Sequence, residues 1–261
     1  MMSLSDNDLL RYDRQIVLKG FDIDKQQCLA DANVMIVGMG GLGCAVATYL
    51  AASGVGALTL VDPDIISLSN LPRQILYSDT DCGQAKVDIA KQQLSLRNPD
   101  CTITTHSHAL EESAFWRDRC AEHDLIIDCT DQLSSRQHLN RCCFATSVPL
   151  ISGAAIRMEG YVMCFSWQHE EPCYECLSYL FGEEKGSCVE NGVMSPLTGV
   201  IGSLQAMEAI RYLSDYGART RGKYLLYDAM NFSVTTLTLK RNPYCKLCAR
   251  PRTRPGTVSI S

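Results

Sequence analysis

Several features that would assign a chain at once to a large functional class are missing here. The longest apolar stretch, residues 44–61, is interrupted by Ser53 and two glycines, so it predicts a helix followed by a strand rather than a membrane span. No run of Lys and Arg stands out and the formal net charge is −5, which disfavours nucleic acid or an anionic membrane as a partner. The N-terminus, MMSLSDNDLLRYDRQ, lacks the apolar core of a signal peptide, so we expect a cytoplasmic protein.

Motifs for some common chemistries are also absent. The sequence contains no G-x-x-x-x-G-K-[ST] phosphate-binding loop and no internal repeat. None of its five histidines lies in a motif that suggests a general base; they are His106, His108, His123, His138 and His169. We therefore do not expect catalysis to depend on a histidine base.

Cysteine, by contrast, is abundant, with fourteen residues. A long chain without an export signal favours free thiols in a reducing cytosol over disulfides. Two Cys-x-x-Cys pairs stand far apart in the sequence, Cys173/Cys176 and Cys245/Cys248. Four thiolates bind Zn²⁺ tetrahedrally and leave no position open for a substrate, so we predict a structural zinc site. The alternative is four ordinary buried thiols.

The order of predicted elements indicates an α/β fold. Predicted strands at residues 34–37, 58–61, 102–105, 125–128 and 148–152 alternate with helices that include 42–53 and 84–97, the second ending at Asn98-Pro99. This alternation predicts a Rossmann-like, mostly parallel sheet flanked by helices. The rest of the chain predicts a mostly antiparallel continuation that carries the zinc site. It contains later strands at 161–167, 224–227 and 234–239, a loop over 168–193 and a long helix from Pro196.

A glycine-rich turn follows the first predicted strand. Residues 34–43 read VMIVGMGGLG, which is a strand that runs into G-x-G-x-x-G and then into a helix. Glycines allow the backbone to approach a phosphate closely, and the start of a helix offers unpaired N–H groups. Asp62 ends the next strand, where an acid typically binds ribose hydroxyls. The pattern predicts a nucleotide site and is compatible with an NAD- or FAD-linked oxidoreductase.

Two cations in the segments that follow favour a more highly charged ligand than a dinucleotide. Arg73 lies in SNLPRQ and Lys86 begins the predicted helix after Cys82-Gly83. Added positive charge suits a triphosphate and the pyrophosphate that leaves it. The alternative for either residue is a solvated surface position.

Two aspartates follow a buried strand in IIDCTDQ, at the sheet edge where open α/β sheets bind ligands. A carboxylate at that edge could hold Mg²⁺, which takes its remaining ligands from phosphates and water. The alternative, a strand-end acid that caps the next helix, is about as plausible for Asp128 and less so for Asp131.

Taken together, these segments resemble the MoeB/ThiF/HesA family, the bacterial relatives of ubiquitin-activating enzymes. The resemblance covers residues 8–248 and rests on RYDRQIVLKGFD, GMGGLG, VDPDIISLSNLPRQ, GQAKV, DCTDQ, both cysteine pairs and GVIGSLQAMEAI. The stretches SGAAIRMEG, PCYECLSYLFGE and CVENGVMSPLTGVIGSLQAMEAI are more similar to the molybdopterin-synthase branch than to the thiamine branch. Pro72 and Gln132 depart from the usual Gln and Asn. The geometry around the adjacent charged residues, Arg73 and Asp131, is therefore open.

The resemblance implies an adenylyltransferase. Its reaction would be ATP-dependent adenylation of the C-terminal Gly-Gly carboxylate of a small β-grasp sulfur-carrier protein, with release of pyrophosphate. The molybdopterin synthase small subunit is the first choice of carrier, and the thiamine-pathway carrier is the alternative. The carboxylate is already ionised, so the reaction needs no general base. A separate persulfide donor would then allow thiocarboxylate formation for molybdenum cofactor biosynthesis.

The resemblance also implies a role for individual residues. Gly38, Gly40, Gly41 and Gly43 would form the ATP-binding turn, Asp62 would bind ribose, Arg73 and Lys86 would hold the phosphates, and Asp131 would position Mg²⁺. Arg14 would reach across a homodimer interface into the neighbour's triphosphate site. Asn70 and Gln74 match motif positions and would assist.

Cys188, in EEKGSCVENG, is a candidate covalent thiol because related activating enzymes use a cysteine in this region. Neighbouring acids would raise its pKa and disfavour the thiolate, so we prefer a loop thiol without a covalent role. Two other classes remain open, the oxidoreductase above and a non-catalytic scaffold with a degenerate ATP site. We expect a single domain over 1–261, with an N-terminal helix (1–22), an ATP-binding part (33–152), a carrier-binding and zinc part (153–248) and a disordered tail (249–261).

Overall fold

β1 (Asn33–Val37) lies between two parallel neighbours, β2 (Ala57–Val61) and β4 (Leu125–Asp128). The structure is a computed structural model that describes residues 4–108, 114–168, 170–181, 192–220 and 222–249. β3 (Thr102–His106) pairs in parallel with β2, and β5 (Leu150–Ile156) pairs in parallel with β4. The carboxyl ends of these strands therefore meet at one edge of the sheet, as the sequence predicts.

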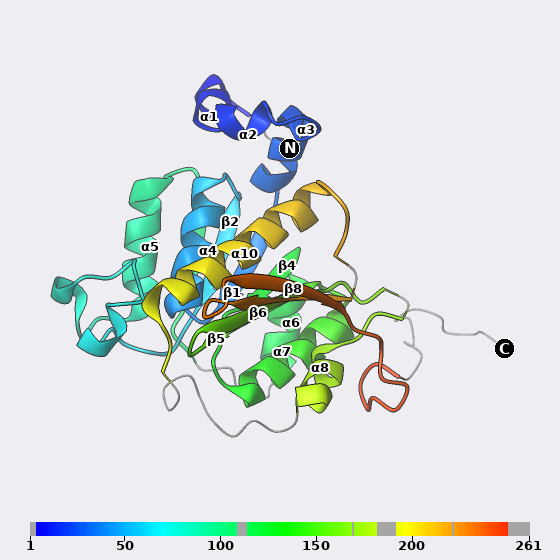
Figure 1. Cartoon of the computed structure of the whole chain (residues 1–261). Coiled ribbons are helices and arrows are strands. Elements are labelled where there is room, and N and C mark those ends of the chain that lie inside the picture. Colours follow the sequence, from blue (N-terminus) through cyan, green and yellow to red (C-terminus); the bar gives the residue numbers. More distant parts are fainter. Residues whose placement is uncertain (1–3, 109–113, 169, 182–191, 221, 250–261) are drawn as a thin grey trace.

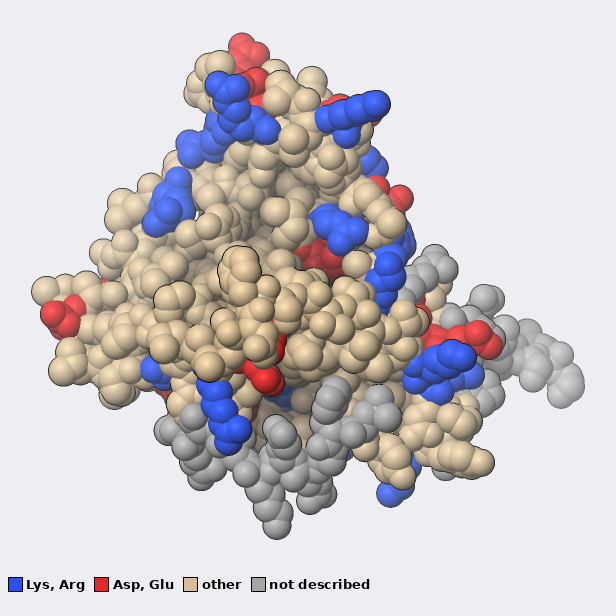
Figure 2. All heavy atoms as spheres, in the orientation of Figure 1, with Lys and Arg blue, Asp and Glu red and all other residues tan. Residues whose placement is uncertain are grey.

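The sheet continues through three antiparallel pairings into β6 (Glu159–Phe165), β7 (Lys223–Asp228) and β8 (Ser233–Thr238). Within the described residues this gives one eight-stranded sheet in the order β3-β2-β1-β4-β5-β6-β7-β8 (Figure 1). The predicted change from parallel to antiparallel strands is confirmed. All six residues of β8 are exposed, and charged side chains are sparse over this part of the face in Figure 2.

Helices cover both faces of the sheet. One face packs against α4 (Gly41–Ala52), α5 (Lys86–Arg97) and α10 (Ser195–Ser214). The other packs against α6 (Ala114–Ala121), α7 (Leu133–Thr146) and α8 (Tyr174–Phe181). Alternate strand residues point to opposite faces, so Ile36 lies in the first core and Met35 in the second. In the described part of the chain, every helix is too short or too polar to cross a membrane.

The N-terminal segment differs from the single helix expected over residues 1–22. It consists of α1 (Asp6–Arg11), α2 (Asp13–Ile16) and the start of α3 (Asp22–Ala30). α1 begins after its N-cap, Ser5, and ends at Arg11, with Tyr12 as the C-cap. Tyr12 is buried, and its hydroxyl accepts a hydrogen bond from Asn98 Nδ2 at 2.9 Å. This long-range contact interrupts the helix, and no local pattern indicates it.

Two further differences concern the C-terminal half. α8 lies inside the segment predicted as a loop over 168–193, and its first turn carries Cys176. The long helix predicted from Pro196 is confirmed as α10. The thirteen described cysteines form no disulfide with one another.

Candidate active site

The glycine turn lies at the carboxyl end of β1. Gly38 has φ +93°, and a Cβ there would lie 2.7 Å from the Cys129 carbonyl oxygen. A Cβ on Gly43 would lie 1.9 Å from the Gly38 carbonyl oxygen. Both positions therefore require glycine. α4 begins at Gly41 without a side-chain cap, so the N–H groups of its first turn are available to an anion.

Asp62 joins the glycine turn to the end of β2. One oxygen of its carboxylate accepts the Met39 N–H at 2.6 Å, and the other accepts the Asp64 N–H at 2.8 Å. Burial raises the pKa of Asp62, while Lys86 and the two N–H groups act against that rise. Asp62, which is predicted to bind the ribose, is therefore held rigidly beside the glycine turn.

Lys86 is the first residue of α5 and is only 5% exposed. Its Nζ lies 2.7 Å from Asp64 Oδ2 and 3.9 Å from Asp62 Oδ1. The alternative of a solvated surface lysine is therefore wrong for this residue. A buried cation with a carboxylate partner on each side is a group that a phosphate oxygen could also bind.

The segment between β2 and α5 carries the remaining predicted nucleotide ligands. Asn70 Oδ1 accepts the Ser67 N–H at 3.3 Å, and Arg73 Nη1 donates to the Ser69 carbonyl oxygen at 2.9 Å. Gln74 is 3% exposed, and its Oε1 has no hydrogen-bond partner in the described structure. Its Nε2 would lie 3.7 Å from a Cβ on Gly40. A buried, unsatisfied amide beside the glycine turn is the kind of group that a bound ligand satisfies.

The two aspartates after β4 have different environments. Asp128 is fully buried and accepts from Thr130 N at 3.0 Å, Thr130 Oγ1 at 2.7 Å and Ser152 Oγ at 2.8 Å. Its carboxylate is fully used in shaping the turn. Asp131 is exposed and has no hydrogen bond or ion pair among the described residues. Its free carboxylate at the carboxyl edge fits the hard oxygen ligand that Mg²⁺ prefers.

The structure thus brings the glycine turn, Asp62, Lys86, Gln74 and the Asp131 loop together. Arg14 does not join them within its own chain. It lies on α2 with 96% of its side chain exposed, and its Nε is 3.8 Å from Asp13. Of the two departures from the family pattern, Pro72 is exposed, and Gln132 is the N-cap of α7 without a side-chain hydrogen bond. Cys188 lies outside the described residues.

Some residues that build this site were not predicted. Thr198, on α10, lies so close to Gly41 that a Cβ there would be 2.7 Å from its hydroxyl. Tyr77 donates its hydroxyl to the Met39 carbonyl oxygen at 2.9 Å. Asp64 is the nearest partner of Lys86. Asp64 lies within VDPDIISLSNLPRQ and Thr198 within CVENGVMSPLTGVIGSLQAMEAI, whereas Tyr77 is identified by tertiary contact alone.

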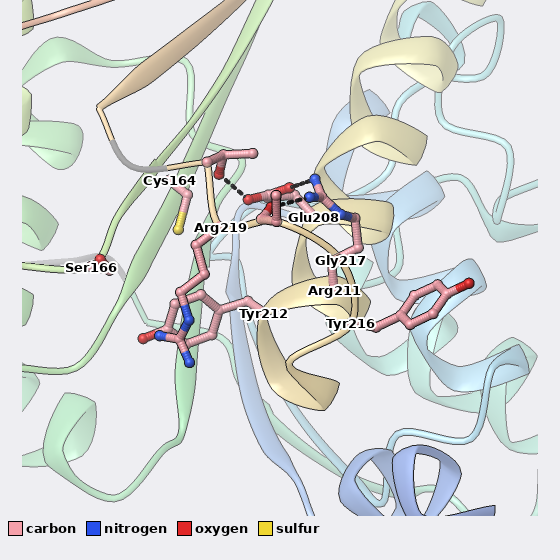
Figure 3. A pocket seen from close by; sticks show the side chains of 10 residues that line it. Cys164, Ser166, Glu208, Arg211, Tyr212, Tyr216, Gly217 and Arg219 are labelled. Carbon is pink, nitrogen blue, oxygen red and sulfur yellow. Dashed lines mark hydrogen bonds and ion pairs between the residues drawn. The ribbon is translucent and has the colours of Figure 1, made fainter. Parts of the chain in front are cut away.

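A small cavity at the C-terminal end of α10 is separate from this site (Figure 3). Its volume of about 20 Å³ has room for about one water molecule. Arg211 pairs with Glu208 at 2.7 Å, Thr220 donates to the same carboxylate, and Arg219 pairs with Asp215 at 3.0 Å. These groups satisfy one another, so we assign no ligand to the cavity.

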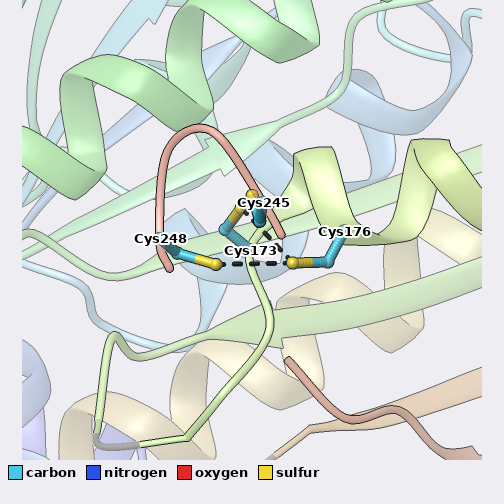
Figure 4. A group of neighbouring side chains, drawn as sticks. All are labelled: Cys173, Cys176, Cys245 and Cys248. Carbon is cyan, nitrogen blue, oxygen red and sulfur yellow. Dashed lines mark hydrogen bonds between the residues drawn. The ribbon is translucent and has the colours of Figure 1, made fainter. Parts of the chain in front are cut away.

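The four predicted zinc ligands come together between the start of α8 and the loop after β8, as Figure 4 shows. The sulfur atoms of Cys173, Cys176, Cys245 and Cys248 all lie within 4.8 Å of one another, and all four residues are buried. The separations are 3.9 Å for Cys173–Cys176, 3.6 Å for Cys173–Cys245 and 3.4 Å for Cys176–Cys248. A tetrahedral ion with metal–sulfur bonds of about 2.3 Å requires about 3.8 Å.

The electrostatics of this cluster also suit a metal ion. Cys173 and Cys248 donate hydrogen bonds to Cys176 and lower its pKa. The Asn242 N–H donates to the same sulfur at 3.4 Å. At least one thiolate is therefore stabilised before any ion binds, and the donor set fits a tetrahedral thiophilic metal.

Comparison with known proteins agrees with this architecture. The chain is 55% identical over 250 residues to the molybdopterin-synthase adenylyltransferase of Escherichia coli K12, covering 96% of this chain and 100% of the relative. It is 44% identical over 242 residues to the enzyme of that name from Haemophilus influenzae, covering 93% and 99%. The sulfur carrier protein ThiS adenylyltransferase of E. coli K12 is 39% identical over 253 residues, covering 97% and 100%.

Solved structures show the same fold at lower identity. The crystal structure of E. coli MccB with ATP superposes with a TM-score of 0.79 at 23% identity, over 91% of this chain and 74% of that one. The ThiF family matches residues 12–247, which include the glycine turn, the Asp131 loop and three of the four clustered cysteines. Together with the full-length relatives, this match shows that the chain belongs to the ThiF family.

Proposed function

We propose that this protein adenylates the C-terminal carboxylate of a small sulfur-carrier protein at the expense of ATP. The observation that carries the proposal is the buried Lys86, paired with Asp62. The Asp62 carboxylate also holds the Met39 N–H of the glycine turn, which leads into the uncapped start of α4, and the unsatisfied Gln74 lies beside Gly40 of the same turn. That arrangement binds a ribose and a phosphate chain at once. Relatives that align over their full length are named adenylyltransferases, which supports the same reaction class.

In this mechanism the protein supplies positioning and positive charge rather than acid–base chemistry. A terminal carboxylate with a pKa of about 3.5 is already an anion and attacks the α-phosphate directly. The N–H groups at the start of α4 and the Lys86 ammonium hold the phosphate chain, and Arg73, on the segment between β2 and α5, would add a further positive charge. The new bond joins the carrier's carboxylate oxygen to the α-phosphorus, and pyrophosphate leaves with the electrons of the broken bond.

The proposed metal ions have separate tasks. Asp131 would ligate Mg²⁺, which neutralises phosphate charge when it is bound. The four clustered cysteines would hold Zn²⁺ as a structural ion, because a four-thiolate site leaves no position for a substrate.

The proposal includes a homodimer, since Arg14 is 96% exposed and pairs only with Asp13 among the residues that the structure describes. The N-terminal helices expose Leu10, Val17 and Ile23, and the segment after β2 exposes Leu68 and Ile75. Apolar side chains exposed in both places support burial of these surfaces against a second copy. In such a dimer Arg14 would complete the partner's triphosphate site.

The carrier would dock on the antiparallel end of the sheet, and its tail would extend toward the glycine turn. The hairpin of β7 and β8 exposes Met230, Phe232, Val234 and Leu237. The molybdopterin synthase small subunit is the favoured carrier, and the relative named for ThiS supports the thiamine carrier as a second candidate. A separate persulfide donor and a cytoplasmic location belong to this proposal.

ATP–pyrophosphate exchange tests the function directly. Purified protein with Mg²⁺, ATP and labelled pyrophosphate should form labelled ATP only when a carrier with an intact Gly-Gly end is present. The molybdopterin synthase small subunit and the thiamine carrier are compared at equal concentration, and a carrier without its last glycine is the control. Absence of exchange with both carriers, or tight binding of NADH in place of ATP, would reject the proposal.

A further inference from the structure

Arg136 is a charged residue in the protein interior that none of the proposed steps uses. It lies on the first turns of α7 and is only 7% exposed. Its Nη2 donates to the Thr130 carbonyl oxygen at 2.6 Å, and its Nη1 donates to the Tyr161 hydroxyl at 2.7 Å. A buried guanidinium is costly unless its donors are satisfied, so these two acceptors have specific importance.

The Thr130 peptide is held from the opposite side as well. Asp128 accepts the Thr130 N–H at 3.0 Å and its hydroxyl at 2.7 Å, and it is itself fixed by Ser152 at 2.8 Å. Thr130 is therefore anchored through its N–H, its side chain and its carbonyl. Asp131 follows immediately, and Gln132 then begins α7 as its N-cap. The exposed Asp131 is thus held between two fixed neighbours.

Tyr161 fixes the guanidinium in turn. Its ring stacks on Tyr224 with centroids 5.0 Å apart and planes at 26°, so the antiparallel strands β6 and β7 support it. Burial alone lowers the pKa of Arg136, but Tyr161 and Asp128 outweigh this and hold the pKa above its usual range. Arg136 therefore stays a cation at physiological pH.

The same loop touches the glycine turn. A Cβ on Gly38 would lie 2.7 Å from the Cys129 carbonyl oxygen, so Cys129 and Gly38 are in direct contact. A shift of the Thr130 peptide would move Asp131 relative to the turn that binds the phosphate chain. Displacements of about 1 Å in positioning groups can cost about 100-fold in rate.

We propose that Arg136, oriented by the Tyr161 hydroxyl, is a positioning residue that holds the Asp131 carboxylate where it meets the metal-bound triphosphate. This inference rests on the proposed function. It adds Arg136 on α7, which acts through the Thr130 carbonyl, and Tyr161 on β6, which acts through Arg136.

The test compares Tyr161→Phe and Arg136→Lys with the matched control Tyr227→Phe. Tyr227 lies on β7 opposite Gly160 and has no hydroxyl hydrogen bond in the described structure. We expect Tyr161→Phe to lower kcat for carrier-dependent exchange about 10-fold, with KM for ATP within about twofold of wild type. Arg136→Lys should cost more, because lysine lacks the planar guanidinium whose two nitrogens reach the two acceptors at once.

A second readout does not depend on turnover. Electron paramagnetic resonance measures Mn²⁺ binding to the protein with a non-hydrolysable ATP analogue, and Tyr161→Phe should weaken that binding about fivefold. Melting temperature and metal content establish that each variant is folded. If Arg136→Lys does not fold, the Tyr161→Phe results alone test the inference. Unchanged Mn²⁺ affinity and kcat in Tyr161→Phe, or equal losses in Tyr227→Phe, would overturn the inference. Failure of the wild type to exchange would reject the proposed function, while the Mn²⁺ measurement would still decide on positioning.

Discussion

At the residue scale, Lys86 is the buried cation of the candidate site. A cation that is 5% exposed needs compensating anions, and Asp62 and Asp64 supply them. Asp62 is held by two backbone N–H groups, whereas the Asp64 side chain is 65% exposed and can turn into solvent. We infer that an incoming phosphate competes with Asp64, not with Asp62, for the lysine.

Lys86→Ala is expected to lower kcat/KM for carrier-dependent exchange by about 10²–10³-fold, the usual cost of losing one preorganised charge. Asp64→Asn is the matched variant, because it removes the competing anion and keeps the cation. Its kcat/KM should stay within about 10-fold of wild type. Initial rates over a range of ATP concentrations measure both. Equal losses in the two variants would mean that the ion pair, not the lysine charge, is required.

At the element scale, the site depends on how closely α4 and α10 approach each other. A Cβ on Gly41 would lie 2.7 Å from the Thr198 hydroxyl, and a Cβ on Gly202 would lie 2.5 Å from the Leu42 carbonyl oxygen. Small residues on both helices therefore allow the contact. This contact sets the start of α4, where the phosphate is expected to bind.

Gly41→Ala should push the start of α4 away from α10, at a cost of about 1–3 kcal/mol for overpacking, and raise KM for ATP. Gly199→Ala is the matched control on α10, because nothing lies within 4 Å of a Cβ there. It should stabilise the helix by about 0.5–1 kcal/mol. Urea unfolding and exchange kinetics measure the two effects. A Gly41→Ala protein with wild-type stability and KM would contradict this account.

Local sequence patterns predict some elements of this fold and miss others. Strands such as β1 and β4 were predictable because strands buried on both faces appear as short continuous apolar runs. The end of α5 was predictable because Asn98 precedes a proline. The break at Tyr12 was not, since it depends on a hydrogen bond to Asn98, 86 residues away.

The candidate site follows the same distinction. The glycine turn, Asp62 and Lys86 lie in contiguous motifs, and the structure brings them together. Arg136 and Tyr77 lie outside every motif, because each acts through the backbone carbonyl of another segment. The sequence therefore indicates the residues that would contact the ligand more clearly than it indicates the residues that hold them in place.

At the scale of the whole molecule, the cysteine cluster connects the segment before α8 to the loop after β8. Cys245→Ser should remove bound zinc and lower the melting temperature by on the order of 10 °C, because metal binding and folding are coupled. Cys82→Ser is the control, since Cys82 is exposed and lies outside the cluster. Metal analysis and thermal unfolding measure the outcome. Full zinc content and an unchanged melting temperature in Cys245→Ser would exclude a structural metal at this site.

The other whole-molecule prediction concerns two copies of the chain. Arg14 is exposed and Asp131 stands free in the candidate site, so a site shared between subunits would take one residue from each chain. Arg14→Ala and Asp131→Ala proteins should each be inactive alone. After mixing and subunit exchange, a heterodimer regains one intact site of two, which gives about a quarter of wild-type exchange activity in an equal mixture.

Mass spectrometry of a tagged and an untagged variant verifies that subunits have exchanged. The control is a mixture of tagged and untagged Arg14→Ala, which should stay inactive because every site still lacks the arginine. Recovery in the first mixture and none in the second would require Arg14 to act on the neighbouring chain, since only subunit mixing can then restore a complete set of charges. Demonstrated exchange without recovery would instead confine the reaction to a single chain and leave the exposed Arg14 without a part in it.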